Sequence, residues 1–293
     1  MRLFFILHLI FMWGCSSYSV IELSSRYKDE RIKYLVIHFT SENFERSLEI
    51  LTGKTESMVS VHYLVPEPGD PSYLNNNINV YSLVTEEKRA WHAGISHWGG
   101  VSALNGTSIG IEIVNRSTCL NLQQEILEEE HLFPRRDCNF YVFPEEQIDT
   151  VILLIKDILS RNPGIEPINV VGHGDIAINR RVDPGPLFPW EQLYKNGIGA
   201  WYESEAVAEF KDILSVHPVQ IEVIQKALKA YGYDVVVTGS KDAQTELAIQ
   251  AFQMHFRASD YSGIIDNETV SILFALLDKY HPKKFNQIFK IKN

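Results

Sequence analysis

Four polar side chains interrupt or end apolar runs of this 293-residue chain and could together carry metal chemistry. They are His38 in VIHF, Glu112 in GIEI, His173 in VVGH and Asp183 in RVDPG. Two histidines and a carboxylate match a catalytic zinc site, in which three protein ligands leave a fourth position open. A charged glutamate in a buried strand is costly without a partner or a task. Beside a zinc site, such a carboxylate can accept a proton as general base.

These four residues also have a plainer interpretation. The chain contains ten histidines, so a pair of them near an acid is not unusual. A single histidine in a strand is more often a hydrogen-bonded core residue than a metal ligand. Residue types and spacing alone therefore leave both interpretations open.

The segments that carry these residues alternate between strand and helix patterns. Apolar, β-branched or strictly alternating runs predict strands. Apolar positions at helical spacing, with Pro144 suited to a first helical turn, predict the main helix. We expect strands at 34–39, 60–65, 79–84, 108–114 and 169–171, and helices at 43–52 and 144–160. This alternation indicates an α/β domain.

The C-terminal part has a different pattern. The stretch 182–200 is rich in proline and glycine and is expected to be irregular, and 201–216 could bridge to a second unit. From Pro218 onward the apolar spacing becomes helical, with glycines between the segments. Helices are expected near 219–231, 243–256 and 267–280. Two domains agree with the length of the chain.

The first residues resemble an export signal. Arg2 precedes an apolar run from Leu3 to Trp13, which is too short for a membrane span of about 20 residues. Gly14-Cys15 after such a run resembles a bacterial lipoprotein cleavage site, which would make Cys15 the lipidated N-terminus. Ser16 then favours the outer membrane. An ordinary signal peptide or a cytoplasmic protein are the alternatives.

Charge and cysteine content exclude other classes. The formal net charge is -10 and no basic cluster is longer than two residues, so a nucleic-acid partner is not expected. Three cysteines are too few for a disulfide scaffold. In an exported protein, Cys119 and Cys138 could form a structural bridge, the alternative being two free thiols.

Six motifs in order resemble the zinc-dependent N-acetylmuramoyl-L-alanine amidases, in particular the lipoprotein amidases of the AmiD type. They are VIHFT, SVHYLVP, AWHAGIS, TSIGIEIVN, VVGHGDIA and DPGPLFPW. The resemblance implies a mixed central β-sheet flanked by helices, with a zinc ion in a groove along one face. It implies hydrolysis of the amide between N-acetylmuramic acid and L-alanine of peptidoglycan or its fragments, in cell-wall turnover.

The same resemblance assigns expected roles to residues. The metal ligands fall on His38, His173 and Asp183, and the catalytic glutamate falls on Glu112. Arg181 stands where the family has a lysine that stabilises the oxyanion. His62, Trp91 and His92 are expected in the substrate groove or around it, with core packing the alternative for His62. Asp175 could orient a ligand histidine or cap a turn.

The C-terminal helices resemble peptidoglycan-binding three-helix modules. The pattern Gly-x-x-Asp-x-x-Thr appears at Gly239 to Thr245 and again at Gly263 to Thr269. Asp before a helix also caps its free N–H groups, so these turns have a structural cause too. The expected order is a signal peptide at 1–14, a lipidated linker at 15–30, a zinc amidase domain at 31–205 and this module at 206–293.

Two other functions stay open at this point. A binding protein with the same fold would have lost a metal ligand, whereas all three are present. A zinc deacetylase would release acetate in place of a stem peptide. The expected protein is a monomer, lipid-anchored to the periplasmic face of the outer membrane.

Overall fold

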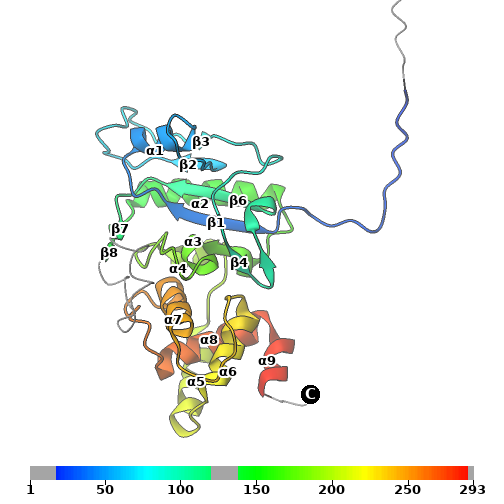
Figure 1. Ribbon diagram of the computed structural model, residues 1–293, viewed down its shortest axis with the longest axis vertical. Coiled ribbons are helices and arrows are strands. Elements are labelled where there is room, and N and C mark those ends of the chain that lie inside the picture. The colour runs from blue at the N-terminus through cyan, green and yellow to red at the C-terminus, as the bar shows by residue number, and fades with distance from the viewer. Residues whose placement is uncertain (1–17, 120–137, 290–293) are drawn as a thin grey trace, which may run out of the picture.

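The computed structural model describes residues 18–119 and 138–289 (Figure 1). A five-stranded sheet with the order β3-β2-β6-β1-β9 forms its centre. The strands β2, β6, β1 and β9 run parallel, and β3 closes one edge antiparallel to β2. The strand bounds are Tyr34–Phe39 (β1), Tyr63–Val65 (β2), Tyr81–Ser82 (β3), Ser108–Ile113 (β6) and Val170–Gly172 (β9).

Successive side chains of a strand point to opposite faces, and this alternation divides the sheet. Leu35 and Ile37 of β1, with Ile109 and Ile111 of β6, pack in one core with the apolar side of α2 (Glu145–Arg161). His38 and Glu112 occupy even-numbered positions, so they belong to the opposite face. The sheet therefore buries one face against α2 and presents the predicted chemistry on the other.

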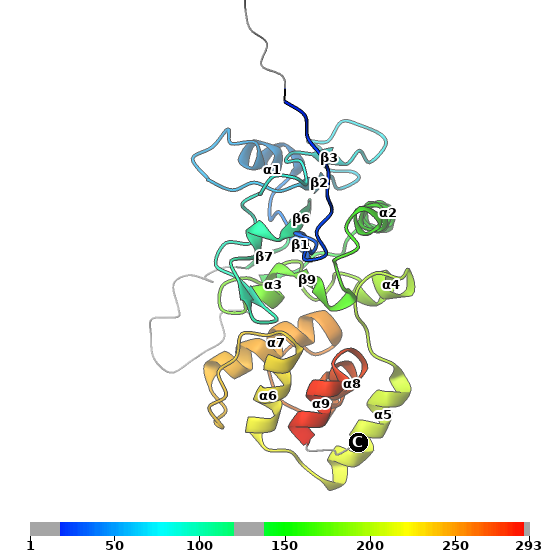
Figure 2. The same cartoon turned by 90° about the vertical axis from the view of Figure 1, so that its right-hand side faces the viewer.

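The remaining elements surround this sheet or follow it. Two short hairpins project from it, one formed by β4 (His97–Trp98) and β5 (Val101–Ser102), the other by β7 (Thr118–Cys119) and β8 (Cys138–Asn139). The C-terminal helices form a separate layer below the sheet, with α7 next to α3 (Figures 1 and 2). Besides α2, the α-helices outside that layer are α1 (Phe44–Leu51), α3 (His173–Ile176) and α4 (Trp190–Lys195). The layer itself contains α5 (Ser204–Val216), α6 (Ile221–Tyr231), α7 (Ala243–Phe256), α8 (Asn267–Tyr280) and α9 (Pro282–Phe289). Within the described residues, no helix combines the length and the apolarity that a membrane crossing requires.

The predicted class, an α/β domain with a C-terminal helical region, is confirmed, with differences in detail. The segment expected to be irregular contains α4, whose Trp190 and Leu193 are buried in the sheet's core. The predicted strands at 60–65 and 79–84 form only the short β2 and β3, because β3 is an edge strand that pairs at two positions. The helical part also has more than three helices, since α5 and α9 both pack on α8.

The helical part shares a hydrophobic core with the sheet domain. Val36 of β1 and Ile176 of α3 belong to the same buried cluster as Leu228 and Phe252 of the C-terminal helices. Trp98 of β4 (His97–Trp98) links the two sides, since its ring meets that of Tyr233 edge-on with 4.9 Å between centroids. The boundary near residue 206 therefore separates sequence patterns while the packed interior continues across it.

Candidate metal centre and groove

The strand register sets His38 beside Glu112. These residues are paired positions of the parallel strands β1 and β6. On the other side of β1, Ile37 pairs with Gly172, so His173 begins α3 directly after the end of β9. The carboxyl ends of adjacent parallel strands thus bring both histidines and the glutamate to one edge of the sheet, where open α/β sheets usually bind ligands.

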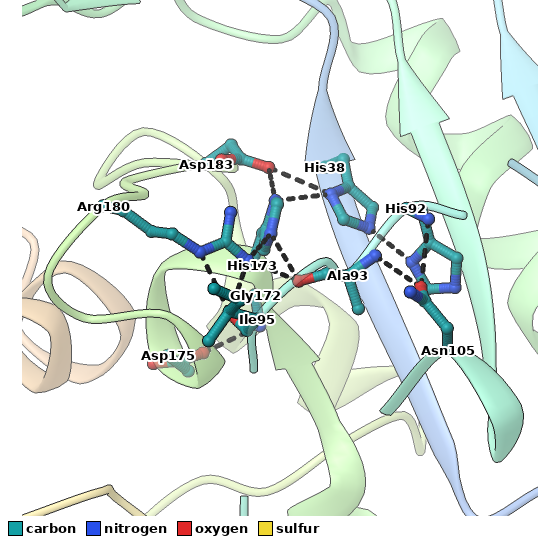
Figure 3. A network of polar contacts seen from close by, with 10 residues as sticks. All are labelled: His38, His92, Ala93, Ile95, Asn105, Gly172, His173, Asp175, Arg180 and Asp183. Carbon is teal, nitrogen blue, oxygen red and sulfur yellow. Dashed lines mark hydrogen bonds and ion pairs between the residues drawn. The ribbon is translucent and has the colours of Figure 1, made fainter. Parts of the chain in front are cut away.

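Three potential ligand atoms converge at this edge. His38 Nδ1 lies 3.0 Å from His173 Nδ1, and each lies 3.1 Å from Asp183 Oδ2 (Figure 3). All three residues are buried. The structure therefore brings together the histidines and the aspartate that the resemblance indicates, and the group has the composition of a metal site.

The hydrogen bonds around the centre determine which ring nitrogens carry protons. Ser108 Oγ donates to Leu104 O at 2.8 Å, so it accepts from His92 Nε2 at 3.1 Å. His92 Nδ1 is then an acceptor and receives the proton of His38 Nε2 at 3.0 Å. Burial and nearby histidines lower the pKa of His92 well below its usual value, and burial and His173 lower the pKa of His38 to about 4. Both rings are therefore neutral, and His38 Nδ1 presents a lone pair.

The second histidine is held at its other nitrogen. His173 Nε2 lies 3.2 Å from the carbonyl oxygen of Ala93, an acceptor, and 3.3 Å from Arg180 Nη2, a donor. With the proton of His173 on Nε2, directed at Ala93 O, the Nδ1 atom presents a lone pair, and two lone pairs and a carboxylate oxygen face one another. Such an arrangement suits a cation. Zinc ligand atoms in tetrahedral geometry lie roughly 3.3 Å apart, so the donor types and their spacing fit zinc.

Glu112 lies in a setting that favours its protonated form. Its Oε2 is inaccessible to solvent and has no hydrogen-bond partner in the described part of the chain. Burial, and secondarily the negative charge of Asp183, raise the pKa of Glu112 well above its usual value, whereas the positive charge of Arg181 lowers it. A carboxylate poised in this way suits proton transfer near neutral pH.

The centre opens into a pocket of about 260 Å³ lined by His173, Asp183, Glu112 and Arg181. The pocket continues past Trp91 into a wider groove of about 1040 Å³ beside the end of α1. Trp91 is half exposed, and the Arg89 guanidinium lies 4.0 Å above its ring. The Trp91 side chain thus forms a wall shared by pocket and groove.

The other predicted residues differ in where they lie relative to the pocket. His92 lines the pocket at 8% exposure and supports His38, and its ring lies so close to Gly110 that a Cβ there would come within 2.6 Å. His62 is fully buried, with Nδ1 accepting from Gly110 N and Nε2 near Lys88 O. Its geometry is that of core packing, and it does not line the pocket. Asp175 accepts from Gly172 N at 2.7 Å, so it caps α3, and no hydrogen bond among the described residues joins it to the His173 ring.

Sequence reasoning missed Arg180 and Ser108. Arg180 donates to the carbonyl oxygens of Ala93 and Ile95 and thereby fixes the loop that accepts from His173 (Figure 3). Gly94 has a φ of +55°, which L side chains rarely adopt, and a Cβ there would also lie 2.9 Å from this guanidinium, so the position favours glycine. The neighbouring Arg181 was predicted because it stands where the family has a lysine. No sequence signal distinguishes Arg180 or Ser108 from other polar residues.

Cys119 and Cys138 form a disulfide between the paired strands β7 (Thr118–Cys119) and β8 (Cys138–Asn139). The structure thus joins the two cysteines for which a bridge is predicted. It lies apart from the pocket lining, so its role is structural. The predicted signal peptide and Cys15 lie outside the described residues.

In the two Gly-x-x-Asp-x-x-Thr turns of the helical part, the polar groups form hydrogen bonds within the helical part itself. Asp242 and Asp266 cap α7 and α8 by accepting from Thr245 N and Thr269 N. The Gln225 amide bonds Thr245 Oγ1 and the backbone of the first turn. Gln253 repeats this arrangement at the second turn with Thr269. The motif therefore has a structural function in this chain.

Comparisons with known proteins agree with this architecture. A family model described as N-acetylmuramoyl-L-alanine amidase matches residues 28–186, and one described as a putative peptidoglycan binding domain matches residues 218–273. The N-acetylmuramoyl-L-alanine amidase AmiD of Escherichia coli K12 is 44% identical over 251 residues, which cover 85% of this chain and 84% of that protein.

Two solved structures resemble the whole fold. AmpDh3 from Pseudomonas aeruginosa, in complex with anhydromuramic pentapeptide, has a TM-score of 0.79 and 38% identity, covering 90% of this chain and 98% of that one. AmiD from Escherichia coli, in complex with the substrate anhydro-N-acetylmuramic acid-L-Ala-D-gamma-Glu-L-Lys, has a TM-score of 0.71 and 40% identity, covering 88% and 93%.

Proposed function

Because the chain belongs to the N-acetylmuramoyl-L-alanine amidase family and is a cell-wall amidase of the AmiD type, we propose that His38, His173 and Asp183 hold its zinc ion. The observation that carries this proposal is the convergence of two imidazole nitrogens and a carboxylate oxygen within 3.0–3.1 Å. A zinc ion held there would polarise the substrate carbonyl and make water at the site more acidic.

Glu112 is the general base of this proposal. Its carboxylate accepts a proton from the attacking water and returns it to the departing amine nitrogen of L-alanine. The raised pKa of Glu112 suits both steps, since it can take the proton and still release it. Register pairing with His38 holds the carboxylate beside the ligands throughout the reaction.

Arg181 stabilises the negative charge that develops on the carbonyl oxygen. It lines the same pocket as Glu112 and acts on the pKa of that residue as a positive charge. A guanidinium supplies charge and a fixed set of donors but stays protonated, so its contribution is electrostatic. Arginine can therefore serve at the position where the family has lysine.

We propose muropeptides with an N-acetylmuramyl–L-alanine bond as substrates, including 1,6-anhydro forms. Support comes from the substrate and the anhydromuramic pentapeptide in the two similar structures. The Trp91 side chain provides an apolar wall for such a ligand between pocket and groove.

A lipid anchor at Cys15 on the periplasmic face of the outer membrane is part of the proposal. Residues 18–31 are exposed and lead away from the sheet, which suits a tether (Figure 1). In a bacterial host, labelled palmitate should enter the wild-type protein and not Cys15→Ala. The tethered protein is proposed to be a monomer, which light scattering of a soluble form tests.

Metal analysis tests the zinc assignment. The purified protein should hold one zinc per chain and cleave an anhydromuramyl peptide, and a chelator should stop cleavage. His173→Ala should lose both the metal and the activity. His97→Ala is the matched control, because His97 pairs with Ser102 outside the centre and should keep both. Zinc retained by His173→Ala would contradict the assignment.

A further inference from the structure

Asp175 connects the metal centre to the C-terminal helices. It follows His173 by two residues, is 4% exposed and caps α3 through Gly172 N. Its Oδ1 accepts from the Tyr233 hydroxyl at 2.7 Å, and its Oδ2 lies 2.7 Å from His255 Nδ1, which donates to it. Two of its three partners thus come from the helical layer, 58 and 80 residues along the chain.

Both partners are themselves held in place. The His255 ring stacks on Trp190 of α4 with 3.8 Å between centroids and 12° between planes. Tyr233 is 1% exposed and packs edge-on against Trp98. Both side chains are therefore buried and packed against aromatic rings where they meet Asp175.

Helix α7 also packs on the segment that carries the other proposed ligand, Asp183. Ala251, Met254 and His255 of α7 meet the backbone around Gly172 and Asp183, and the void between them is only about 10 Å³. That is no more than a single water requires. The segments that carry His173 and Asp183 are therefore packed directly on the C-terminal helices.

We propose that the C-terminal module positions the zinc ligand His173, with Tyr233 and His255 as positioning residues that act through Asp175. The inference rests on the proposed role of His173 in zinc binding. A carboxylate fixed by two donors fixes the Gly172 N–H that it accepts from, and thereby the start of α3. Because the ligand is held before the ion arrives, binding spends less free energy on ordering it.

The test is the zinc dissociation constant of the full chain, measured by competition with a chromophoric chelator. Tyr233→Phe removes only the hydroxyl, and His255→Leu removes the ring donor. Residues behind a ligand typically change metal affinity by 10- to 100-fold, so each variant should bind zinc about tenfold more weakly. His255→Asn keeps a donor near the position of Nδ1 and should recover most of the affinity.

Excess zinc provides a second readout. It should restore kcat/KM of Tyr233→Phe to the wild-type value, because the variant binds zinc more weakly but keeps every proposed catalytic group. Tyr280→Phe is the control, since it removes a hydroxyl of the same module that bonds Trp201 and not Asp175. This variant should bind zinc as the wild type does.

The outcomes separate this inference from the proposed function. If the wild type holds zinc, His173→Ala does not, and Tyr233→Phe binds zinc as tightly as Tyr280→Phe, the positioning role is overturned and the zinc assignment stands. If the wild type holds no zinc, both the zinc assignment and the positioning role are overturned. Tyr233→Phe carries the test by itself if His255→Leu does not fold.

Discussion

His38 and Glu112 are directly paired residues on the adjacent parallel strands β1 and β6, and their side chains emerge on the same face. The backbone hydrogen bonds of the sheet therefore set the spacing between a proposed zinc ligand and the proposed general base. A shift of the register by one residue would send one of them into the core on the other face. The chemistry of this amidase thus depends on the pairing of its two central strands.

The partly buried carboxyl group of Glu112 should affect the stability of the metal-free protein. Its folded-state pKa lies above the ordinary value of 4.5, so below about pH 4.5 it is protonated in both states. As the pH rises, the unfolded chain loses this proton first, and the folded state loses stability until its own pKa is passed. At pH 7, Glu112→Gln should therefore have a free energy of unfolding roughly 1–3 kcal/mol higher than that of the wild type, measured by urea denaturation.

The same comparison at pH 4.5 is the control for that prediction. There the two proteins should differ little, because the carboxyl group is neutral. Equal stability of wild type and Glu112→Gln at pH 7 would show that the carboxylate is compensated in the folded state.

Arg181 should act through its charge. Arg181→Ala should lower kcat by about 10²–10³, the usual loss for one oxyanion donor. Because the guanidinium lowers the pKa of Glu112, its removal should also move the acid limb of kcat/KM to higher pH. Arg181→Lys should retain most of the rate. Arg46→Ala on α1, whose partner is Glu49, serves as the control for loss of a surface arginine. An unchanged pH profile in Arg181→Ala would contradict the electrostatic role.

Ser108 should influence zinc binding through the proton arrangement of two histidines. Ser108→Ala removes the acceptor of His92 Nε2, so His92 no longer favours the form that accepts from His38. Zinc affinity should fall by about tenfold. Ser96→Ala is the matched control, since that hydroxyl bonds only the Gly94 and Leu104 backbone among the described contacts. Nitrogen NMR of the His38 ring should show a proton on Nε2 in wild type. A proton on Nδ1 would contradict the account.

The disulfide should contribute stability without affecting catalysis. Cys119 and Cys138 are 19 residues apart, and closing such a loop stabilises a protein by about 3 kcal/mol in the chain-entropy model. The double change to serine should lower the free energy of unfolding by about that amount and leave kcat within about twofold of wild type. A large loss of kcat in the folded double variant would assign the hairpin a role in the groove.

Sequence patterns located the chemistry because polar residues stand out in apolar strands. His38 and Glu112 interrupt runs that otherwise build a core, and His173 and Asp183 directly follow β9 or lie in a turn after it. Local patterns also predicted α2, α7 and α8 closely, since their apolar spacing and caps are carried by neighbouring residues.

Contacts between distant segments left no such signal. Nothing near Tyr233 or His255 indicates that they meet Asp175, because that contact exists only once α7 packs on α3. Helix α4 was missed because prolines and glycines dominate its surroundings, while burial of Trp190 stabilises it. The motif left His62 open between a position in or around the groove and a core position, and only the packing shows its ring buried and edge-on to that of His92.

The most direct test of the central claim is mass spectrometry of the products formed from an anhydromuramyl peptide in ¹⁸O-water. The account predicts a free stem peptide with an unlabelled amino terminus and a muramic acid whose lactyl carboxyl group carries one ¹⁸O. A chelator should abolish both products, added zinc should restore them, and Glu112→Gln with zinc bound should form them about 10²–10⁴ times more slowly. Release of acetate with the stem peptide still attached, or an undiminished rate in Glu112→Gln, would contradict the account.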